Sequence, residues 1–281
     1  MIIWLASYPK SGNTWVRSIV SSLIYSQSGD FNFNLLKNIK QFPQKKYFKD
    51  EVSDFGDFDK IKSNWILIQN KINLDKEIKF FKTHQGNYTV GGDSFTNKAN
   101  TKAVIYIVRD PRNVVSSISN HFSLSLEKSL DFMMSPKIIG NTKKFEENGK
   151  GILTLLGKWN EHYSSWTKKV ENVLIIKYED LLLAPILELN KIILFLKKFI
   201  NFHTNENKNN NILRNTSFEN LKKLEDLHSF EEAALDKITK SKINFFNLGP
   251  KNNWESAVDE KIVKIIEKEF YKEMKELGYL K

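Results

Sequence analysis

A short segment near the start of the chain combines a tight turn, small polar side chains and one lysine. It reads Lys10-Ser11-Gly12-Asn13-Thr14 and follows directly on an apolar run. Apolar residues then return with helical spacing, so a strand passes through this turn into a helix. Gly12 lets the backbone approach a ligand, and the amides at a helix start form an anion site beside the charge of Lys10. The segment predicts a cradle for a phosphate-like group; an ordinary strand-turn-helix with a solvated lysine is the alternative.

The cradle is not a Walker A loop. That motif needs Gly-x-x-x-x-Gly-Lys followed by Ser or Thr. The Gly-Lys pairs at 149–150 and 157–158 lack this spacing and the hydroxyl. A nucleotide-binding site of the usual ATPase kind is therefore not expected.

A second segment with chemical potential is Lys82-Thr83-His84, which ends another apolar run. Histidine titrates near neutral pH and can take the proton of an attacking hydroxyl. A lysine beside it can stabilise charge on a group in transfer. A structural histidine is the alternative interpretation.

Two more runs end in polar groups, at Arg109 and at Tyr178-Glu179-Asp180. A guanidinium can bind two phosphate oxygens at once, and Ser117, 117 − 109 = 8 positions later, adds a hydroxyl. The alternative for Arg109 is a local ion pair with Asp110, and for Ser117 an ordinary helix surface.

The composition narrows the class of site. The chain has 281 residues, a formal charge of +10, no cysteine and five histidines without a metal-ligand spacing. Disulfides, thiolate zinc sites and cysteine nucleophiles are excluded, and no metal cofactor is expected. The charge favours an acidic ligand, but the lysines are scattered, so nucleic acid is not expected. Apolar runs too short for a membrane span, a first strand beginning at Ile2 and no signal-peptide pattern indicate a cytoplasmic protein.

The elements that must position these groups alternate between strands and helices. Strands are expected from Ile2 onward and over 78–84, 103–108 and 173–177. Helices are expected over 15–24, 65–72, 111–118, 125–134, 152–166 and 185–196, from Thr216 onward, and over 258–277. Loops are expected over 26–58, which should also contain short helices, and over 201–211. This alternation predicts an α/β fold with a parallel sheet flanked by helices, and we expect one domain over 1–281. Ligands of such sheets bind at the carboxyl ends of the strands, where the polar groups above are found.

The segment Tyr8-Pro9-Lys10-Ser11-Gly12-Asn13-Thr14-Trp15 resembles the phosphosulfate-binding loop of sulfotransferases that use 3′-phosphoadenosine 5′-phosphosulfate (PAPS). The resemblance implies the P-loop-NTPase-like sulfotransferase fold. It also implies PAPS as co-substrate and adenosine 3′,5′-bisphosphate as product. It further implies that Lys10 to Trp15 bind PAPS, with the indole of Trp15 stacked on adenine, and that Arg109 and Ser117 bind the 3′-phosphate. Adenine contacts are implied for Tyr178, Thr216 and Phe218. Catalysis is implied for Lys10, Lys82 and His84, with His84 as the general base.

One region departs from the family pattern. Many members carry Arg-Lys-Gly-x-x-Gly-x-Trp near the C-terminus, and alignment on Gly249 and Trp254 places Asn247 and Leu248 at the Arg and Lys positions. Lys251 lies in the same loop and is expected to reach the 3′-phosphate instead. The family's dimerisation motif is not evident, so the oligomeric state stays open.

These observations predict transfer of a sulfuryl group from PAPS to a hydroxyl or amine of a small-molecule or carbohydrate acceptor. The stretches 26–58 and 85–100 match no substrate signature. Two alternatives remain from the residues alone: a P-loop-like nucleoside or small-molecule kinase, which would need a divalent metal, and a basic, non-enzymatic polyanion-binding protein.

Overall fold

The structure is a computed structural model that describes residues 1–140, 152–228, 230, 232–235 and 242–280. The chain forms two compact units. Unit 1 comprises Met1–Tyr8, Ile39–Tyr106 and Ser135–Ile175, and unit 2 comprises Pro9–Asn38, Ile107–Met134 and Ile176–Lys281.

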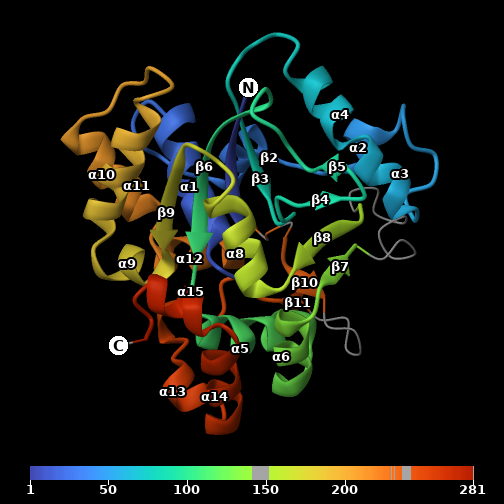
Figure 1. The fold of residues 1–281 in the computed structure, drawn as a ribbon. Coiled ribbons are helices and arrows are strands. Elements are labelled where there is room, and N and C mark those ends of the chain that lie inside the picture. The colour runs from blue at the N-terminus through green and yellow to red at the C-terminus, as the bar shows by residue number, and fades with distance from the viewer. Residues whose placement is uncertain (141–151, 229, 231, 236–241, 281) are drawn as a thin grey trace. The chain divides into compact units, whose positions relative to one another are not determined.

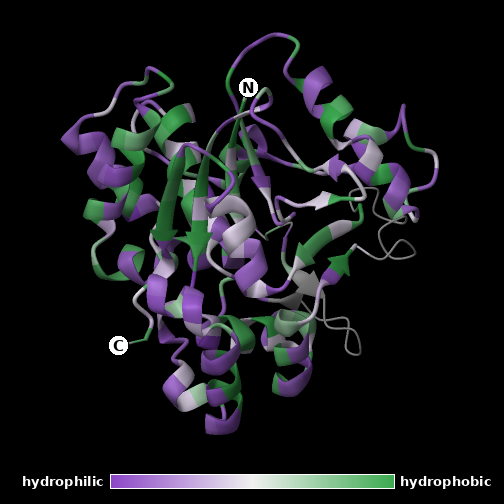
Figure 2. Ribbon diagram, viewed as in Figure 1, coloured by the Kyte–Doolittle hydropathy of each residue, from purple (hydrophilic) through white to green (hydrophobic). Residues whose placement is uncertain are grey.

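A five-stranded sheet with the order β2-β3-β1-β6-β9 organises unit 1. Its strands are β1 (Ile2–Ser7), β2 (Lys40–Gln41), β3 (Lys79–Thr83), β6 (Thr101–Val108) and β9 (Val173–Lys177). β1 and β2 both pair in parallel with β3, Ile2 lying opposite Lys79 and Lys40 opposite Phe81. Every residue of β1 is buried, and β6 and β9 are strongly hydrophobic (Figure 2). The four expected strands and the parallel sheet are confirmed; β2, with only two residues, was not predicted.

The chain leaves unit 1 near the carboxyl ends of three strands, β1, β6 and β9 (Figure 1). The last residues of unit 1 at these points are Tyr8, Tyr106 and Ile175. His84, Arg109 and Tyr178 each follow directly on the last residue of a strand, and Lys10 comes three residues after β1. The prediction that each chemical group stands at a strand end is therefore confirmed.

The rest of unit 1 consists of short helices and two hairpins. These are α2 (Lys45–Phe48), α3 (Phe58–Ser63), α4 (Trp65–Ile72), α8 (Trp159–Thr167), the pair β4 (Thr89–Val90) and β5 (Asp93–Ser94), and the pair β7 (Lys137–Ile139) and β8 (Thr154–Gly157). Trp4 of β1 lies in an aromatic core with ring centroids of Phe42, Phe95 and Trp166 within 5.8 Å. The helix expected over 65–72 and the short helices within 26–58 are confirmed.

The expected helix over 152–166 is wrong in its first half. Residues 154–157 form β8, which pairs antiparallel with β7, and only α8 from Trp159 is helical. Gly157 has a φ of +69°, a backbone conformation that ends the strand and turns the chain into α8. Short apolar runs such as Leu155-Leu156 fit a strand and a helix equally well by spacing, so the pairing partner decided the outcome.

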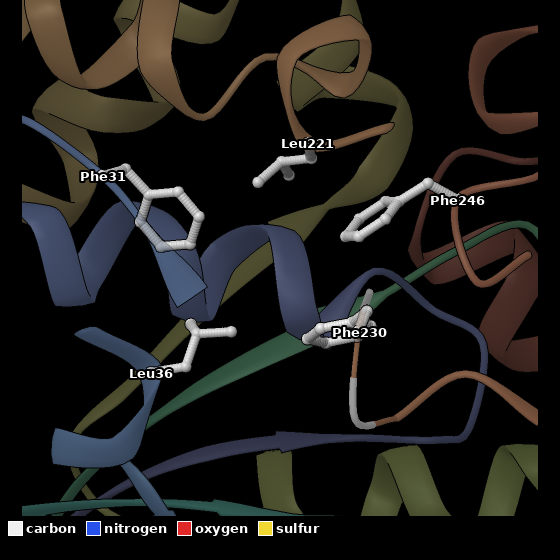
Figure 3. Close-up of a cluster of buried hydrophobic side chains, with 5 residues drawn as sticks. All are labelled: Phe31, Leu36, Leu221, Phe230 and Phe246. Atoms are coloured by element: carbon white, nitrogen blue, oxygen red, sulfur yellow. The ribbon is translucent and has the colours of Figure 1, made fainter. Parts of the chain in front are cut away.

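Unit 2 is mainly helical. Its elements are α1 (Asn13–Tyr25), η1 (Phe33–Asn38), α5 (Pro111–Phe122), α6 (Leu126–Met134), α9 (Tyr178–Leu183), α10 (Pro185–Leu196), α11 (Glu206–Asn215), α12 (Phe218–His228), the hairpin β10 (Ala234–Leu235) and β11 (Lys242–Ile243), η2 (Gly249–Lys251), α13 (Trp254–Ala257), α14 (Glu260–Glu269) and α15 (Tyr271–Glu276). Five buried side chains from four parts of the unit form one apolar cluster (Figure 3): Phe31, Leu36, Leu221, Phe230 and Phe246. In this cluster η1 and α12 pack against the segments before and after the hairpin, which contribute Phe230 and Phe246.

Three expectations for unit 2 need correction. The loop expected over 201–211 becomes α11 at Glu206, because the Asn205 side chain accepts a hydrogen bond from the Lys208 amide (2.8 Å) and so caps that helix. Thr216 ends α11 instead of capping the next helix; Ser217 takes that role by accepting a bond from the Asn220 amide (3.2 Å). The closing helix expected over 258–277 breaks at Phe270 into α14 and α15.

Candidate active site

The predicted site residues fall into two groups, one in each unit. Unit 1 holds Lys82 and His84. Unit 2 holds Lys10, Ser11, Gly12, Asn13, Thr14, Trp15, Arg109, Ser117, Tyr178, Thr216, Phe218, Gly249 and Lys251.

The turn before α1 has an unusual backbone. Lys10 has a φ of +67° and Gly12 a φ of +98°, both in the left-handed region. A β carbon on Gly12 would stand 2.6 Å from Cδ2 of Tyr178, so only glycine fits there. A left-handed lysine is costly, and such strain is concentrated at ligand-binding turns. The backbone thus supports the cradle predicted from the sequence.

The ring of Tyr178 brings three predicted residues of unit 2 together. Besides its contact with Gly12, it lies edge-on to Trp15, with centroids 5.4 Å apart, and the guanidinium carbon of Arg109 lies 4.2 Å from its centroid. Burial raises the pKa of the Tyr178 hydroxyl above its usual value, so the ring stays neutral at physiological pH. A cation over a neutral aromatic face is held by the ring quadrupole. Arg109 is thereby positioned beside the turn, where its Nη1 also donates to the Lys10 carbonyl (3.4 Å).

Oγ of Ser11 and Nε of Arg109 are buried polar atoms without a hydrogen-bond partner in the described part of the chain. The two residues are 1% and 5% exposed. An unpaired buried donor costs about 1–3 kcal/mol, so such atoms mark places where a ligand completes the hydrogen bonding. The expected alternative for Arg109, an ion pair with Asp110, is not favoured, because Asp110 pairs with Arg112 (2.6 Å).

A carboxylate that the sequence did not point to lies at the start of α1. Glu232 accepts hydrogen bonds from Nη1 of Arg17 (2.6 Å) and from the hydroxyl of Thr14 (3.4 Å). Nζ of Lys10 lies over the ring of Phe245, 4.3 Å from its centroid. The hydroxyl of Thr14 and the ammonium of Lys10 are therefore both held by residues far along the chain.

The remaining predicted residues of unit 2 differ in exposure. Ser117 is half-buried on α5, and Lys251 is exposed. Phe218 contacts Gly249 closely enough that a β carbon there would lie 2.2 Å from its ring. Thr216 is fully buried, and its hydroxyl donates to the Ile212 carbonyl (2.8 Å), so that hydroxyl is used inside the protein.

A hydrogen-bonded amide network holds the loop of Lys251 on α5. The Asn252 side chain donates to the Asn113 carbonyl and accepts from the Ser116 hydroxyl, both at 2.9 Å. The Asn113 side chain accepts from the amide of Trp254 (2.9 Å). The loop that carries Lys251 is thus fixed to the helix that carries Ser117. Sequence reasoning missed this network, because single asparagines and serines carry no motif.

In unit 1, the ring of His84 has a defined orientation. Its Nδ1 lies 2.8 Å from the Ser7 carbonyl oxygen, a distance at which Nδ1–H donates to the carbonyl. That tautomer leaves Nε2 as the nitrogen able to accept a proton. His84 can therefore act as a general base through Nε2. Lys82, two residues earlier in β3, is 4% exposed.

A second histidine fixes the backbone of His84. Nε2 of His162 lies 3.0 Å from the His84 carbonyl oxygen, and Nδ1 of His162 lies 2.8 Å from the hydroxyl of Tyr106. Burial lowers the pKa of His162 to about 3, so it is neutral, with Nε2–H donating to His84 and Nδ1 accepting from Tyr106. His162 is fully buried on α8. Only the structure shows this role, since its spacing from His84 in the sequence is uninformative.

Clusters of possible metal ligands and membrane-spanning helices are both absent from the parts of the chain that are described. Over these residues, no group of three or more histidines and carboxylates could hold a metal ion. Likewise, none of their helices is long and apolar enough to cross a bilayer.

Comparisons with known proteins agree with the motifs. A family model described as "Sulfotransferase domain" matches residues 2–278. The luciferin sulfotransferase of Photinus pyralis is 26% identical over 273 residues, which cover 93% of this chain and 68% of that protein. Among solved structures, a mouse sulfotransferase complexed with PAP aligns with a TM-score of 0.57 at 19% identity, covering 97% of this chain and 84% of that one. A retinol dehydratase in complex with androsterone and inactive cofactor PAP aligns with a TM-score of 0.59 at 20% identity, covering 98% and 80%. These likenesses confirm the predicted fold class.

Proposed function

The chain belongs to the sulfotransferase domain family and is an enzyme of that class, and from this premise we propose that it transfers a sulfuryl group from PAPS to a small-molecule acceptor. The observation that carries the choice of PAPS is the arrangement around Tyr178 in unit 2. It places Arg109, Trp15 and the Gly12 turn together, in the pattern expected for a nucleotide with a 3′-phosphate. The neighbours solved with PAP support the same choice.

The residues of unit 2 fit such a nucleotide in three respects. The turn at Gly12 leads directly into the N-terminus of α1, where backbone amides and the helix dipole favour an anion. The buried Nε of Arg109 and Oγ of Ser11 offer unpaired hydrogen-bonding groups. The half-buried indole of Trp15 supplies an aromatic surface for a base. PAPS would supply the sulfuryl group and leave as adenosine 3′,5′-bisphosphate.

We assign three residues to the transfer itself. His84 takes the proton of the attacking acceptor group at Nε2, because Nδ1 is committed to the Ser7 carbonyl. Lys10 stabilises negative charge on the oxygen that leaves, and Lys82 stabilises the oxygens of the group in transfer.

Ser117 and Lys251 assist Arg109 at the 3′-phosphate, with Lys251 taking the place of the missing Arg-Lys pair. Tyr178, Thr216 and Phe218 are assigned to the adenine end, Thr216 without its hydroxyl, which donates to the Ile212 carbonyl.

The acceptor is proposed to be a small molecule with a hydroxyl or amine group. A relative that acts on luciferin supports a small molecule over a carbohydrate polymer. No comparison favours a kinase or a non-enzymatic polyanion-binding protein. We also propose that 1–281 acts as one domain, in keeping with a family match that spans both units, and that the protein works in the cytoplasm.

Calorimetry with two nucleotides tests the proposal. If Arg109 holds a 3′-phosphate, adenosine 3′,5′-bisphosphate should bind more tightly than AMP by about 2–5 kcal/mol, the usual cost of leaving one partner of a buried charge pair alone. The titration should need no divalent metal, unlike that of a kinase. Equal affinities for the two nucleotides would refute the 3′-phosphate assignment.

A further inference from the structure

The helices α9 and α10 of unit 2 (Figure 1) follow one another in the chain. Both expose large aliphatic side chains. Leu183, at the end of α9, is 84% exposed. On α10, Ile186, Leu187 and Leu194 are 50%, 59% and 68% exposed. We call these four side chains the α10 apolar face. A soluble protein exposes single aliphatic residues routinely, but four together indicate a binding surface.

The opposite face of α10 is already used by the protein's own core. Leu189, Ile192 and Leu196 are fully buried. At 100° per residue these three lie on one side of the helix, Leu187 and Leu194 lie on the opposite side, and Ile186 lies at the edge between the two. A helix that is apolar on both sides is normally covered on both sides. One side of α10 therefore lacks a partner among the residues that the structure describes.

The exposed charged side chains of α10 and of the two residues after it are lysines. Lys191, Lys197 and Lys198 are exposed and lie on the same side of the helix as Leu187 and Leu194. The acid of α10, Glu188, is 2% exposed and pairs with Lys191 at 2.5 Å. On α9, Asp180 pairs with Lys177 (3.5 Å). The exposed side of α10 thus presents aliphatic groups framed by lysines, in a chain whose formal charge is +10.

We propose that the α10 apolar face docks on an anionic lipid surface. Exposed leucines that enter the boundary of headgroups and acyl chains, with flanking lysines on the lipid phosphates, are the features of an interfacial helix. Lysines can also keep their ammonium groups at the headgroups while their stems lie along the apolar layer. The docking is peripheral and does not depend on the choice of PAPS as sulfuryl donor.

A second copy of the chain fits the face less well. A standard interface buries about 800 Å² on each partner. Four aliphatic side chains at the end of one six-residue helix and along one twelve-residue helix offer clearly less. A membrane surface needs no such area, because apolar insertion and charge attraction act together on a few side chains.

Co-sedimentation of the full-length protein with vesicles tests the proposal. The vesicles are phosphatidylcholine alone, or phosphatidylcholine with about a third phosphatidylserine, at low salt. The first variant, Leu187→Gln with Leu194→Gln, removes apolar contact; the second, Lys197→Gln with Lys198→Gln, removes charge. The matched control is Leu74→Gln with Leu227→Gln, two leucines elsewhere that are 78% and 64% exposed. All four proteins are checked for unchanged melting temperature and for light-scattering mass.

Wild type should sediment with the anionic vesicles and far less with the neutral ones. Each Lys→Gln change should weaken partitioning about fivefold, so the lysine pair should lose roughly 25-fold. The leucine pair should lose at least about tenfold, and the control should match wild type. Failure of wild type to sediment with anionic vesicles, or equal loss in the control, overturns the proposal. So does a concentration-dependent dimer that the leucine pair abolishes without any vesicle binding, because a second copy then covers the face.

Discussion

The buried histidine behind the proposed general base gives the most quantitative prediction. His162 is fully buried, donates from Nε2 to the His84 carbonyl and accepts from Tyr106 at Nδ1. Burial lowers its pKa to about 3. In the unfolded chain a histidine titrates near 6.5, so between these two values the unfolded state binds a proton that the folded state does not. The contribution of neutral His162 to the free energy of unfolding is therefore fully present well above pH 6.5 and falls as the pH drops below that value.

The size of the effect follows from the two pKa values. At pH 5 the unfolded histidine lies 6.5 − 5 = 1.5 units below its own pKa, while the folded one is still neutral. At ~1.36 kcal/mol per unit, folding loses about 2 kcal/mol between pH 8 and pH 5. His162→Gln keeps an amide donor but does not titrate. The difference in unfolding free energy between wild type and this variant should therefore shift by about 2 kcal/mol over that range, against wild type at the acid end.

Urea unfolding at pH 8, 7, 6 and 5 measures this difference. His203→Gln, at an exposed position, controls for the loss of a histidine as such. If the difference in unfolding free energy between wild type and His162→Gln stays constant from pH 8 to pH 5, His162 is not buried in its neutral form. A second readout concerns catalysis: His162→Leu, which has no donor for the His84 carbonyl, should slow a single turnover more than His162→Gln.

Two further predictions concern the cofactor end. Gly12→Ala and Gly92→Ala both place alanine at a left-handed φ, and each backbone conformation costs about 1–2 kcal/mol of stability. The new methyl group meets the Tyr178 ring only at position 12. Calorimetry should thus show adenosine 3′,5′-bisphosphate affinity reduced at least about tenfold in Gly12→Ala and nearly unchanged in Gly92→Ala; equal losses would contradict the steric argument. Lys251→Ala should weaken the same nucleotide but not AMP, and an identical loss for both would show that Lys251 does not contact the 3′-phosphate.

Much of the fold was predictable because its strands are short, apolar and bounded by clear turn signals. The runs over 2–7, 79–83, 103–108 and 173–177 form strands of the sheet as expected. The errors lie where the local pattern was ambiguous and a contact that the pattern does not show decided the outcome. Leu155-Leu156 became a strand because β7 was available to pair. Residues 206–211 became helical because Asn205 caps them and Ile212 packs inside.

The site was predictable only where chemistry is written into contiguous residues. The Gly12 turn and the strand-end positions of His84 and Arg109 followed from motif and spacing. The residues that hold them did not, because their contacts join segments far apart in the chain. His162 reaches the His84 backbone across 78 positions, and Asn252 reaches Asn113 across 139. No sequence period encodes such pairs, and a single sequence offers no other signal for them.

The central claim is that His84 is the base of a sulfuryl transfer, and single-turnover kinetics on His84→Ala test it most directly. The substitution removes Nε2 but leaves Lys10, Arg109 and the Gly12 turn intact. The melting temperature and the adenosine 3′,5′-bisphosphate affinity should stay near wild type, while the transfer rate should fall by roughly 10²- to 10⁴-fold. Lys10→Ala, in contrast, should lower both affinity and rate. A stable His84→Ala protein that binds the nucleotide and still transfers sulfuryl at the wild-type rate would contradict the account.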